Sequence, residues 1–375
     1  MSSDLFLVTD IPVPDFSPVP GQVQAAGDYH AGMDCLLNLM ARQELKLYRS
    51  AQEGSLAEPE GLISPDDVVL LKVNAQWKYR GCTNSDVVRG LIQRILEHPE
   101  GFRGEVVIFE NGQGQGSMDG NARGWGRYPD NSIWANAENP SHSFSYLANT
   151  VFAGRGVSTY LLDNIREVFI AETDHQTDGY RIWEGVSYPC FTTAGGSRVE
   201  LREGIWDGTR FVDRIKLINM PVLKTHDGCG VTACLKNFYG VLSMGHPPRD
   251  YHYGEAGKVW GEMIARVRAP VLNILDCTWI SLHHHCGYPA SNTSRLNRLL
   301  ASVDPVALDY WASKYIFYPV SGDPNDHPDH PEAYTDSNLD MHLTQARDTI
   351  NQYGGIRSQP VTRDEREMRL FVDKP

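Results

Sequence analysis

The chain has 375 residues, of which 41% are hydrophobic and 22% are charged, close to the average of folded globular proteins. Its formal net charge of −13, from 34 basic and 47 acidic residues, argues against a main role in binding nucleic-acid phosphates, which needs a basic face. No stretch approaches the roughly 18 uncharged apolar residues of a membrane span, and the N-terminus lacks the basic and apolar regions of a signal peptide, so we expect a cytoplasmic protein with no membrane partner.

The first half of the chain predicts a strand, a helix and a second strand in succession. The apolar run at 68–73 is typical of a short strand buried on both faces, and residues 106–109 form a second such run. Between them, apolar residues recur at helical spacing from 87 to 96, and Thr83 and Asp86 have the spacing of a capping box. This order indicates a βαβ unit with parallel strands.

Two segments in the middle of the chain have a different pattern. Residues 112–140 are rich in glycine and show little periodicity, and an irregular segment of this length is usually functional or disordered. Over 182–211, polar and apolar residues alternate between turn residues, which favours short antiparallel strands. We expect the second segment to form an antiparallel insertion or an edge subdomain.

The second half returns to the parallel pattern. Apolar runs predict strands at 215–220 and 271–275, and helical spacing predicts helices at 231–242 and 255–268. Asp304 followed by proline is typical of a helix N-cap and first turn, so another helix is expected there.

The predicted fold class is α/β, with a mainly parallel sheet, flanking helices, two lobes and an antiparallel insertion. The elements divide the chain into five regions: an N-terminal arm and helix at 1–66, a first α/β lobe with the glycine-rich loop at 67–150, the insertion at 151–212, a second α/β lobe at 213–318, and a polar C-terminal tail or lid at 319–375.

Polar residues follow the predicted strands where ligands bind in open parallel sheets, beyond the strands' carboxyl ends. They are Asn74, the pair at 110–111, the Lys-Thr-His run at 224–226, and Asp276. Each residue alone could simply end a strand or cap a helix, but four strand ends together favour a binding site.

The densest chemical feature is the segment 221–240. Gly228 and Gly230 could let backbone N–H groups converge on an anion just before a helix. Lys224 and Lys236 are cations that burial would convert to reactive amines. His226 can serve as an acid, a base or a ligand. The plainer interpretation is a glycine turn between two solvated lysines.

These residues resemble the domain of unknown function 362 (DUF362) family. The resemblance rests on Lys72-Val-Asn74, Lys224-Thr-His226, Thr232, Leu235-Lys236-Asn237, Gly240 and the run Asp304-Pro-Val-Ala-Leu-Asp309, and it extends over most of 67–315. It implies an α/β fold and names no reaction. Many members of the family carry an attached iron–sulphur cluster domain. In this chain the seven cysteines form no Cys-x-x-Cys pair, which indicates reduced thiols.

A weaker resemblance is to the nickel-pincer lactate racemases, in which a histidine, a glycine-rich turn, a lysine and a further histidine follow in this order. His226, Lys236 and His252 have similar separations here. The resemblance implies that Lys236 could carry a tethered cofactor and that His252 could bind nickel. Asp-Gly-Cys-Gly at 227–230 departs from the glycine turn of that family, which puts cofactor attachment in doubt.

Two histidine-rich segments could also bind a metal. Imidazole, thiolate and carboxylate groups at 283–286 and Asp276 could hold zinc, iron or nickel. Adjacent residues of an extended segment point to opposite faces, however, so we favour a polar surface loop at 283–286. We likewise favour an exposed turn at 326–331.

The resulting hypothesis is a metal- or cofactor-dependent enzyme of oxidoreductase or isomerase type, which transfers a proton or hydride on a small anionic substrate. The cofactor would be a divalent metal, a nickel-pincer-like group or an iron–sulphur group. The alternative is a non-catalytic binding or electron-transfer partner protein. The candidate residues are Lys224, His226, Lys236 and Asn237 for catalysis, Asn74, Gly228, Gly230, Thr232 and Lys236 for cofactor binding, and His252, Asp276 and Asp309 for metal.

Overall fold

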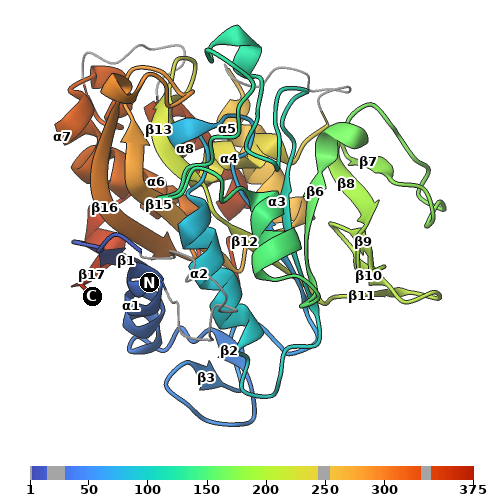
Figure 1. The fold of residues 1–375 in the computed structure, drawn as a ribbon. Coiled ribbons are helices and arrows are strands. Elements are labelled where there is room, and N and C mark those ends of the chain that lie inside the picture. Colours follow the sequence, from blue (N-terminus) through green and yellow to red (C-terminus); the bar gives the residue numbers. More distant parts are fainter. Residues whose placement is uncertain (1, 15–29, 244–253, 331–338) are drawn as a thin grey trace, which may run out of the picture.

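The computed structural model describes residues 2–14, 30–243, 254–330 and 339–375, which form a layered α/β fold (Figure 1). The fold class is the predicted one, with a large, mainly parallel sheet, helices on both faces and a separate antiparallel sheet. In this described part of the chain, no helix combines the length and apolar character needed to cross a membrane.

The central sheet contains strands from nearly the whole length of the chain. Strands β15, β12, β4, β5 and β6 are parallel neighbours, β1 and β17 are parallel to each other, and β16 lies antiparallel between β1 and β15. In sheet order the strands are β17 (Met368–Asp373), β1 (Ser3–Val8), β16 (Thr293–Ser302), β15 (Leu272–Ser281), β12 (Ile215–Asn219), β4 (Val68–Lys72), β5 (Glu105–Glu110) and β6 (Val157–Leu161). Both predicted lobes therefore contribute to one sheet.

Two hydrophobic cores fill the two faces of this sheet. In β4, Val69 and Leu71 belong to the core under α1 and α2, whereas Val68 and Leu70 belong to the core on the other face. This division follows from the alternation of side chains along a strand. The helices are α1 (Ala31–Ala41), α2 (Ser85–Leu96), α3 (Phe144–Tyr146), α4 (Cys234–Asn237), α5 (Ala256–Glu262), α6 (Pro305–Ala312), α7 (Tyr318–Ser321) and α8 (Leu339–Gln352).

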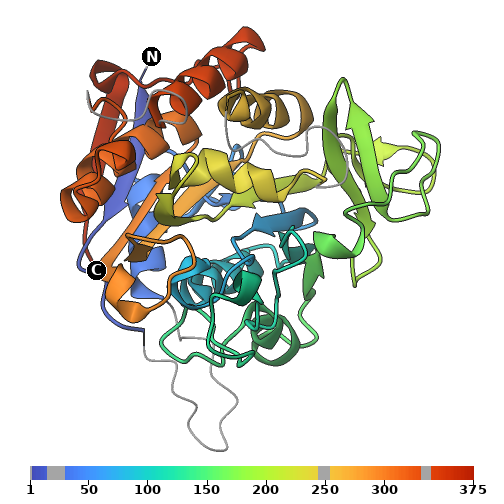
Figure 2. The same cartoon turned by 90° about the horizontal axis from the view of Figure 1, so that it is seen from above.

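The antiparallel insertion forms a second sheet, which projects to one side of the body (Figures 1 and 2, green). Its strands in order are β11 (Phe211–Val212), β10 (Gly204–Trp206), β9 (Arg198–Glu200), β8 (Val186–Thr192) and β7 (Gly179–Trp183). A small parallel pair, β2 (Tyr48–Arg49) and β3 (Ala57–Glu58), lies apart from both sheets.

The two ends of the described chain are part of the central sheet, whereas the sequence suggested an arm and a polar tail or lid. β1 pairs with β17 over six residues of each strand. α8 packs on α5 and buries Leu343, Ala346 and Ile350. The β1–β17 pairing joins residues 365 positions apart, as in Ser3 and Met368, which local patterns do not reveal.

The start of one helix differs from the expected one. α2 is capped by Asn84, whose side-chain oxygen accepts from the amides of Asp86 and Val87. The predicted cap Thr83 instead accepts from the amide of Asn74 and donates to the carbonyl of Met220. Asp304 caps α6 as predicted.

The helix expected at 231–242 is much shorter. Residues Gly230–Thr232 form strand β14, which pairs with β13 (Val222–His226), and only then do α4 and a 3₁₀ turn at Phe238–Gly240 follow. The first residues of the predicted helix are thus part of the β13–β14 hairpin, so the helix begins later and is shorter.

Candidate functional site

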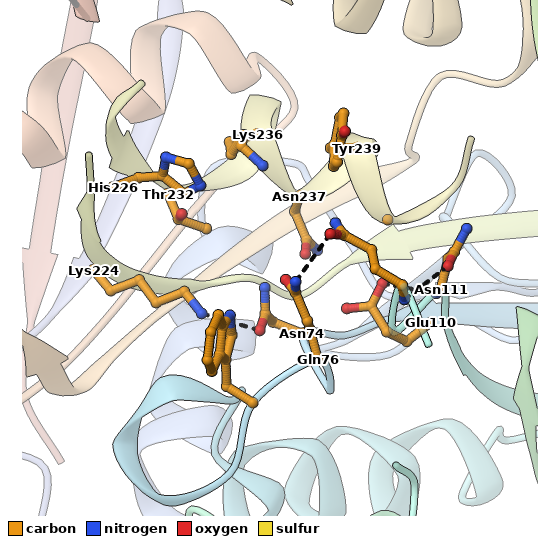
Figure 3. A pocket seen from close by; sticks show the side chains of 13 residues that line it. Asn74, Gln76, Glu110, Asn111, Lys224, His226, Thr232, Lys236, Asn237 and Tyr239 are labelled. Carbon is orange, nitrogen blue, oxygen red and sulfur yellow. Dashed lines mark hydrogen bonds between the residues drawn. The ribbon is translucent and has the colours of Figure 1, made fainter. Parts of the chain in front are cut away.

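A narrow cleft lies beyond the carboxyl ends of β4 and β5 and is closed on its other side by the β13–β14 hairpin and α4 (Figure 3). About 330 Å³ of space, its open mouth included, lies between the lining side chains. The lining residues are Asn74, Gln76, Trp77, Glu110, Asn111, Gln113, Lys224, His226, Thr232, Lys236, Asn237, Tyr239 and Gly240. The cleft thus brings together Asn74, Lys224, His226, Thr232, Lys236 and Asn237, six of the candidate residues.

The hairpin aims three of these side chains at the cleft. Lys224 and His226 are two residues apart on β13 and so share one face of it. Thr232 of β14 is directly opposite Lys224 in the antiparallel register, which places it on the same face. Figure 3 shows Lys236 of α4 and Tyr239 of the 3₁₀ turn after it across the cleft from Asn74 and Glu110.

Lys224 is 1% exposed, and its two hydrogen-bond acceptors are uncharged. Its Nζ donates to the side-chain oxygen of Asn74 at 3.1 Å and to the carbonyl of Gly81 at 2.5 Å. Burial lowers the pKa of Lys224 from 10.5 to about 7. The amine and the ammonium forms are then both populated near neutral pH.

Lys236 is 7% exposed, so it is buried as its position at the edge of an apolar helix face suggested. Its Nζ lies 4.2 Å from the centroid of the Tyr239 ring, a cation–π contact. Lys224 and Lys236 are therefore two buried lysines that line the same space.

A buried ion pair, Lys72 with Glu110, lies beside the cleft, and Glu110 is part of the cleft lining. Lys72 Nζ lies 2.9 Å from Glu110 Oε1 and also donates to the carbonyl of Val73 and to the side chain of Asn237. Glu110 further accepts from the amides of Ala75 and Asn111. Burial lowers the pKa of Lys72 and raises that of Glu110, and their mutual attraction opposes both shifts. Three acceptors around the amine and three donors around the carboxylate fit the ionised pair.

Gly240 is needed for the close packing of this pair. A Cβ atom at Gly240 would lie 2.0 Å from Glu110 Oε1 and 2.8 Å from Lys72 Nζ. The glycine thus leaves the space that the carboxylate occupies.

Asn237 connects the ion pair to the core of the sheet. Its side-chain amide donates to the carbonyl of Lys72 and to the side-chain oxygen of Asn219. Asn219 in turn donates to the side-chain oxygen of Asn273, whose own amide donates to the carbonyl of Ser302. Three buried asparagines therefore link the cleft to strands β12, β15 and β16, a structural role beside the predicted catalytic one.

The glycines expected to hold an anion have another place in the structure. Gly228 lies in the tight connection of the β13–β14 hairpin, Gly230 is the first residue of β14, and neither lines the cleft. Gly230 has the expected positive φ, 72°. The amides at the start of α4 are already hydrogen-bonded, because those of Cys234 and Leu235 donate to the carboxyl group of Asp309.

The candidate metal ligands are not gathered in the described part of the chain, where no group of three or more His, Cys, Asp or Glu residues could hold a metal ion. Asp309 holds α4, as noted. Asp276 lies inside β15 rather than at its end, and accepts from the amides of Asn84 and Thr278. His252 lies outside the described residues. The described residues thus do not fit a three-ligand metal or cluster site.

The structure adds an aromatic wall that sequence reasoning missed. His285 stacks on His226 with ring centroids 5.1 Å apart and contacts Trp77 at 4.6 Å, and His284 stacks on His285. Burial lowers the pKa of His285 to about 2, so its ring is neutral. The segment at 283–286 is therefore not simply a polar surface loop. His283 is exposed, whereas the two histidines after it pack beside the cleft.

Two glutamines also line the cleft without having been predicted. Gln76 Nε2 donates to Gln113 Oε1 at 3.0 Å, which connects the loop after β4 with the loop after β5. Their one sequence signal is position, since each follows a strand end by only a few residues.

Residues 202–314 match the family model described as Domain of unknown function (DUF362). Searches against curated proteins and against solved structures returned no significant match. The matched region contains the lysine, histidine and asparagine motifs at 224–237 and the aspartates at 304 and 309. The upstream motif at 72–74 lies outside it, although the structure places both of its polar side chains against the matched region. The match over residues 202–314 thus agrees with the family resemblance that the motifs in this part of the chain predicted.

Proposed function

We propose that the cleft binds a small anionic substrate and that Lys224 transfers a proton to or from it, with Lys236 as the charge partner of the anion. The single observation that carries the proposal is the position of Lys224, a buried amine with two neutral acceptors that lines a cleft.

The hydrogen bonds of Lys224 leave one position of the nitrogen for a ligand. Two of its N–H groups are directed to Asn74 and Gly81. The third tetrahedral position holds a proton in the ammonium form and a lone pair in the amine form. Because the pKa of Lys224 is about 7, both forms are accessible at neutral pH, as a general acid or base requires.

The charge of the lining favours an anion. Its charged lining side chains are Lys224, Lys236 and Glu110, and Lys72 already neutralises Glu110. The side-chain amide groups of Asn74 and Gln76 add neutral polar contacts. A carboxylate next to Lys236 would bring its α-carbon close to a proton-transfer group, so we favour exchange of a proton on carbon next to a carboxylate.

The proposal includes no step through a metal or a tethered cofactor. Among the described residues, no group of three or more His, Cys, Asp or Glu residues could hold a metal ion. The predicted metal and cofactor roles, including that of His252, stay predictions. So do the cytoplasmic location and the predicted lack of nucleic-acid partners.

The test is solvent exchange. A panel of small 2-hydroxy and 2-amino acids, which carry a hydrogen on the carbon next to the carboxylate, is incubated with the protein in D₂O, and deuterium uptake at that carbon is measured by mass spectrometry. Binding of the same acids is measured by calorimetry. We expect uptake in at least one acid, loss of uptake with retained binding in Lys224→Met, and loss of binding in Lys236→Ala.

Lys258→Met is the matched control, because Lys258 is half exposed and lies outside the cleft. Binding without any exchange in the native protein would favour the non-catalytic alternative. Equal binding by native protein and Lys236→Ala would contradict the anion site itself.

A further inference from the structure

Trp125 stands out in the glycine-rich loop because its backbone is strained and its side chain is exposed. It has φ 48° and lies between Gly124 and Gly126, which have φ 57° and 76°. A bulky residue rarely adopts this left-handed conformation, which costs free energy. The Trp125 side chain is also 54% exposed, so burial does not offset that cost.

The surrounding loop holds this conformation firmly. The amide of Trp125 donates to the side-chain oxygen of Gln115 at 3.1 Å, and the amide of Arg123 donates to the Gln115 carbonyl. Tyr128 packs over Gly124 so closely that a Cβ atom there would lie 2.3 Å from its ring. Strain that the surroundings maintain is typical of functional positions.

Trp125 extends the wall of the cleft outward. Its ring centroid lies 5.2 Å from that of Trp77, with the two planes tilted by 56°. Trp77 lines the cleft, is only 4% exposed, and contacts His285 on another side. The exposed indole of Trp125 therefore continues, toward solvent, an aromatic surface that begins inside the cleft.

We propose that Trp125 forms a second subsite of the cleft, which stacks on a planar ring of the substrate. The substrate is then an acid with an aromatic or heteroaromatic ring, its carboxylate near Lys236 and its ring on Trp125. This inference rests on the proposed function for the anion and adds the class of the group attached to it. Indole rings suit this role because they bury much area at little conformational cost.

The test compares each phenyl acid with its cyclohexyl counterpart, which has the same chain but no planar aromatic ring. Benzoate, phenylacetate and 3-phenylpropionate are each titrated against the full-length protein by calorimetry, beside their cyclohexyl counterparts. We expect the phenyl acid of the best-fitting length to bind roughly tenfold more tightly than its cyclohexyl counterpart, the upper range for one aromatic pair.

Three variants test the residue. Trp125→Gly removes the ring and relieves the strain, since glycine adopts a positive φ readily, so it is expected to fold. It should lose the preference for phenyl acids, whereas Trp125→Phe should keep most of it. Trp134→Ala is the matched control, because Trp134 is another exposed tryptophan of the same loop, 40% exposed, which stacks on Tyr79 outside the cleft lining.

The outcomes separate the two proposals. If phenyl and cyclohexyl acids bind equally well at every length, or if Trp125→Gly keeps the preference, the ring subsite is refuted while the anion site stands. If no acid binds the native protein at millimolar concentration, both proposals fall.

Discussion

The buried Lys72–Glu110 pair allows a quantitative test of what holds the cleft together. In Glu110→Gln, the remaining oxygen can still accept from Lys72 and from the amide of Asn111, which both contact Oε1. The new NH₂ group, however, faces the amide of Ala75, which donates to Oε2 in the native protein. Two donors would then meet, and the ammonium of Lys72 would lose its buried counter-charge.

The expected loss follows from these contacts. Removal of one member of a buried ion pair typically costs about 3–5 kcal/mol, and the retained oxygen places Glu110→Gln near the lower value. We therefore expect the free energy of unfolding to fall by about 3 kcal/mol. Because Lys72→Met removes the unpaired charge, the double variant should lose less free energy of unfolding than the two single variants lose together, by about 1 kcal/mol or more.

The assay is urea unfolding at pH 7, followed by tryptophan fluorescence and by circular dichroism so that both sheets are monitored. Asp66→Asn serves as the control, since Asp66 forms an exposed pair with Arg103 and should matter little. A loss below about 1 kcal/mol for Glu110→Gln, with additive effects in the double variant, would refute the view that the pair is ionised and holds the cleft.

Two further predictions concern the hairpin and α4. Burial raises the pKa of Asp309 from 3.8 to about 7, so the folded protein holds this proton more tightly than the unfolded chain. Its contribution to stability therefore declines as the pH rises from about 4 to about 7. The free energy of unfolding, measured across that range, should depend less on pH in Asp309→Asn than in the native protein. The same pH dependence in both proteins would contradict the raised pKa. Gly230→Ala should destabilise the protein more than Gly154→Ala, because both glycines have φ 72° but only at Gly230 would the new Cβ meet a backbone oxygen, 2.5 Å away at Asn325. Equal melting temperatures of these two variants would show that the hairpin tolerates the contact.

The sequence predicted those parts of the fold that depend on local pattern. The apolar runs at 68–73 and 106–109 are β4 and β5, because strands buried on both faces need continuous apolar residues. The segment at 182–211 lies in the antiparallel sheet, as its alternation of polar and apolar residues predicted. Several candidate residues also share the cleft, since the carboxyl ends of parallel strands meet at one edge.

Features that depend on distant partners were beyond such patterns. The start of α4 is set by Asp309, which lies 75 residues after Cys234, so no local signal marks its true beginning. The pairing of Lys72 with Glu110 joins the ends of two strands, and either residue alone is typical of a strand terminus. The stack of His226 on His285 joins the end of β13 to the loop after β15, and their separation in sequence hides this contact.

The buried polar contacts beneath the cleft affect what the family signature can reveal about chemistry. Within the matched region, Asn237 links strands, Gly240 leaves room for the Glu110 carboxylate, and Asp309 holds a helix start. Trp77, which lines the cleft, and Trp125, which contacts it, lie outside that region, whereas Lys224 and Lys236 lie inside it. A relative could therefore differ at these two tryptophans and still match the family model, because the matched region does not include them. The ring subsite that we propose can therefore vary among proteins that share this match, whereas the two lysines of the proposed anion site are part of the matched region.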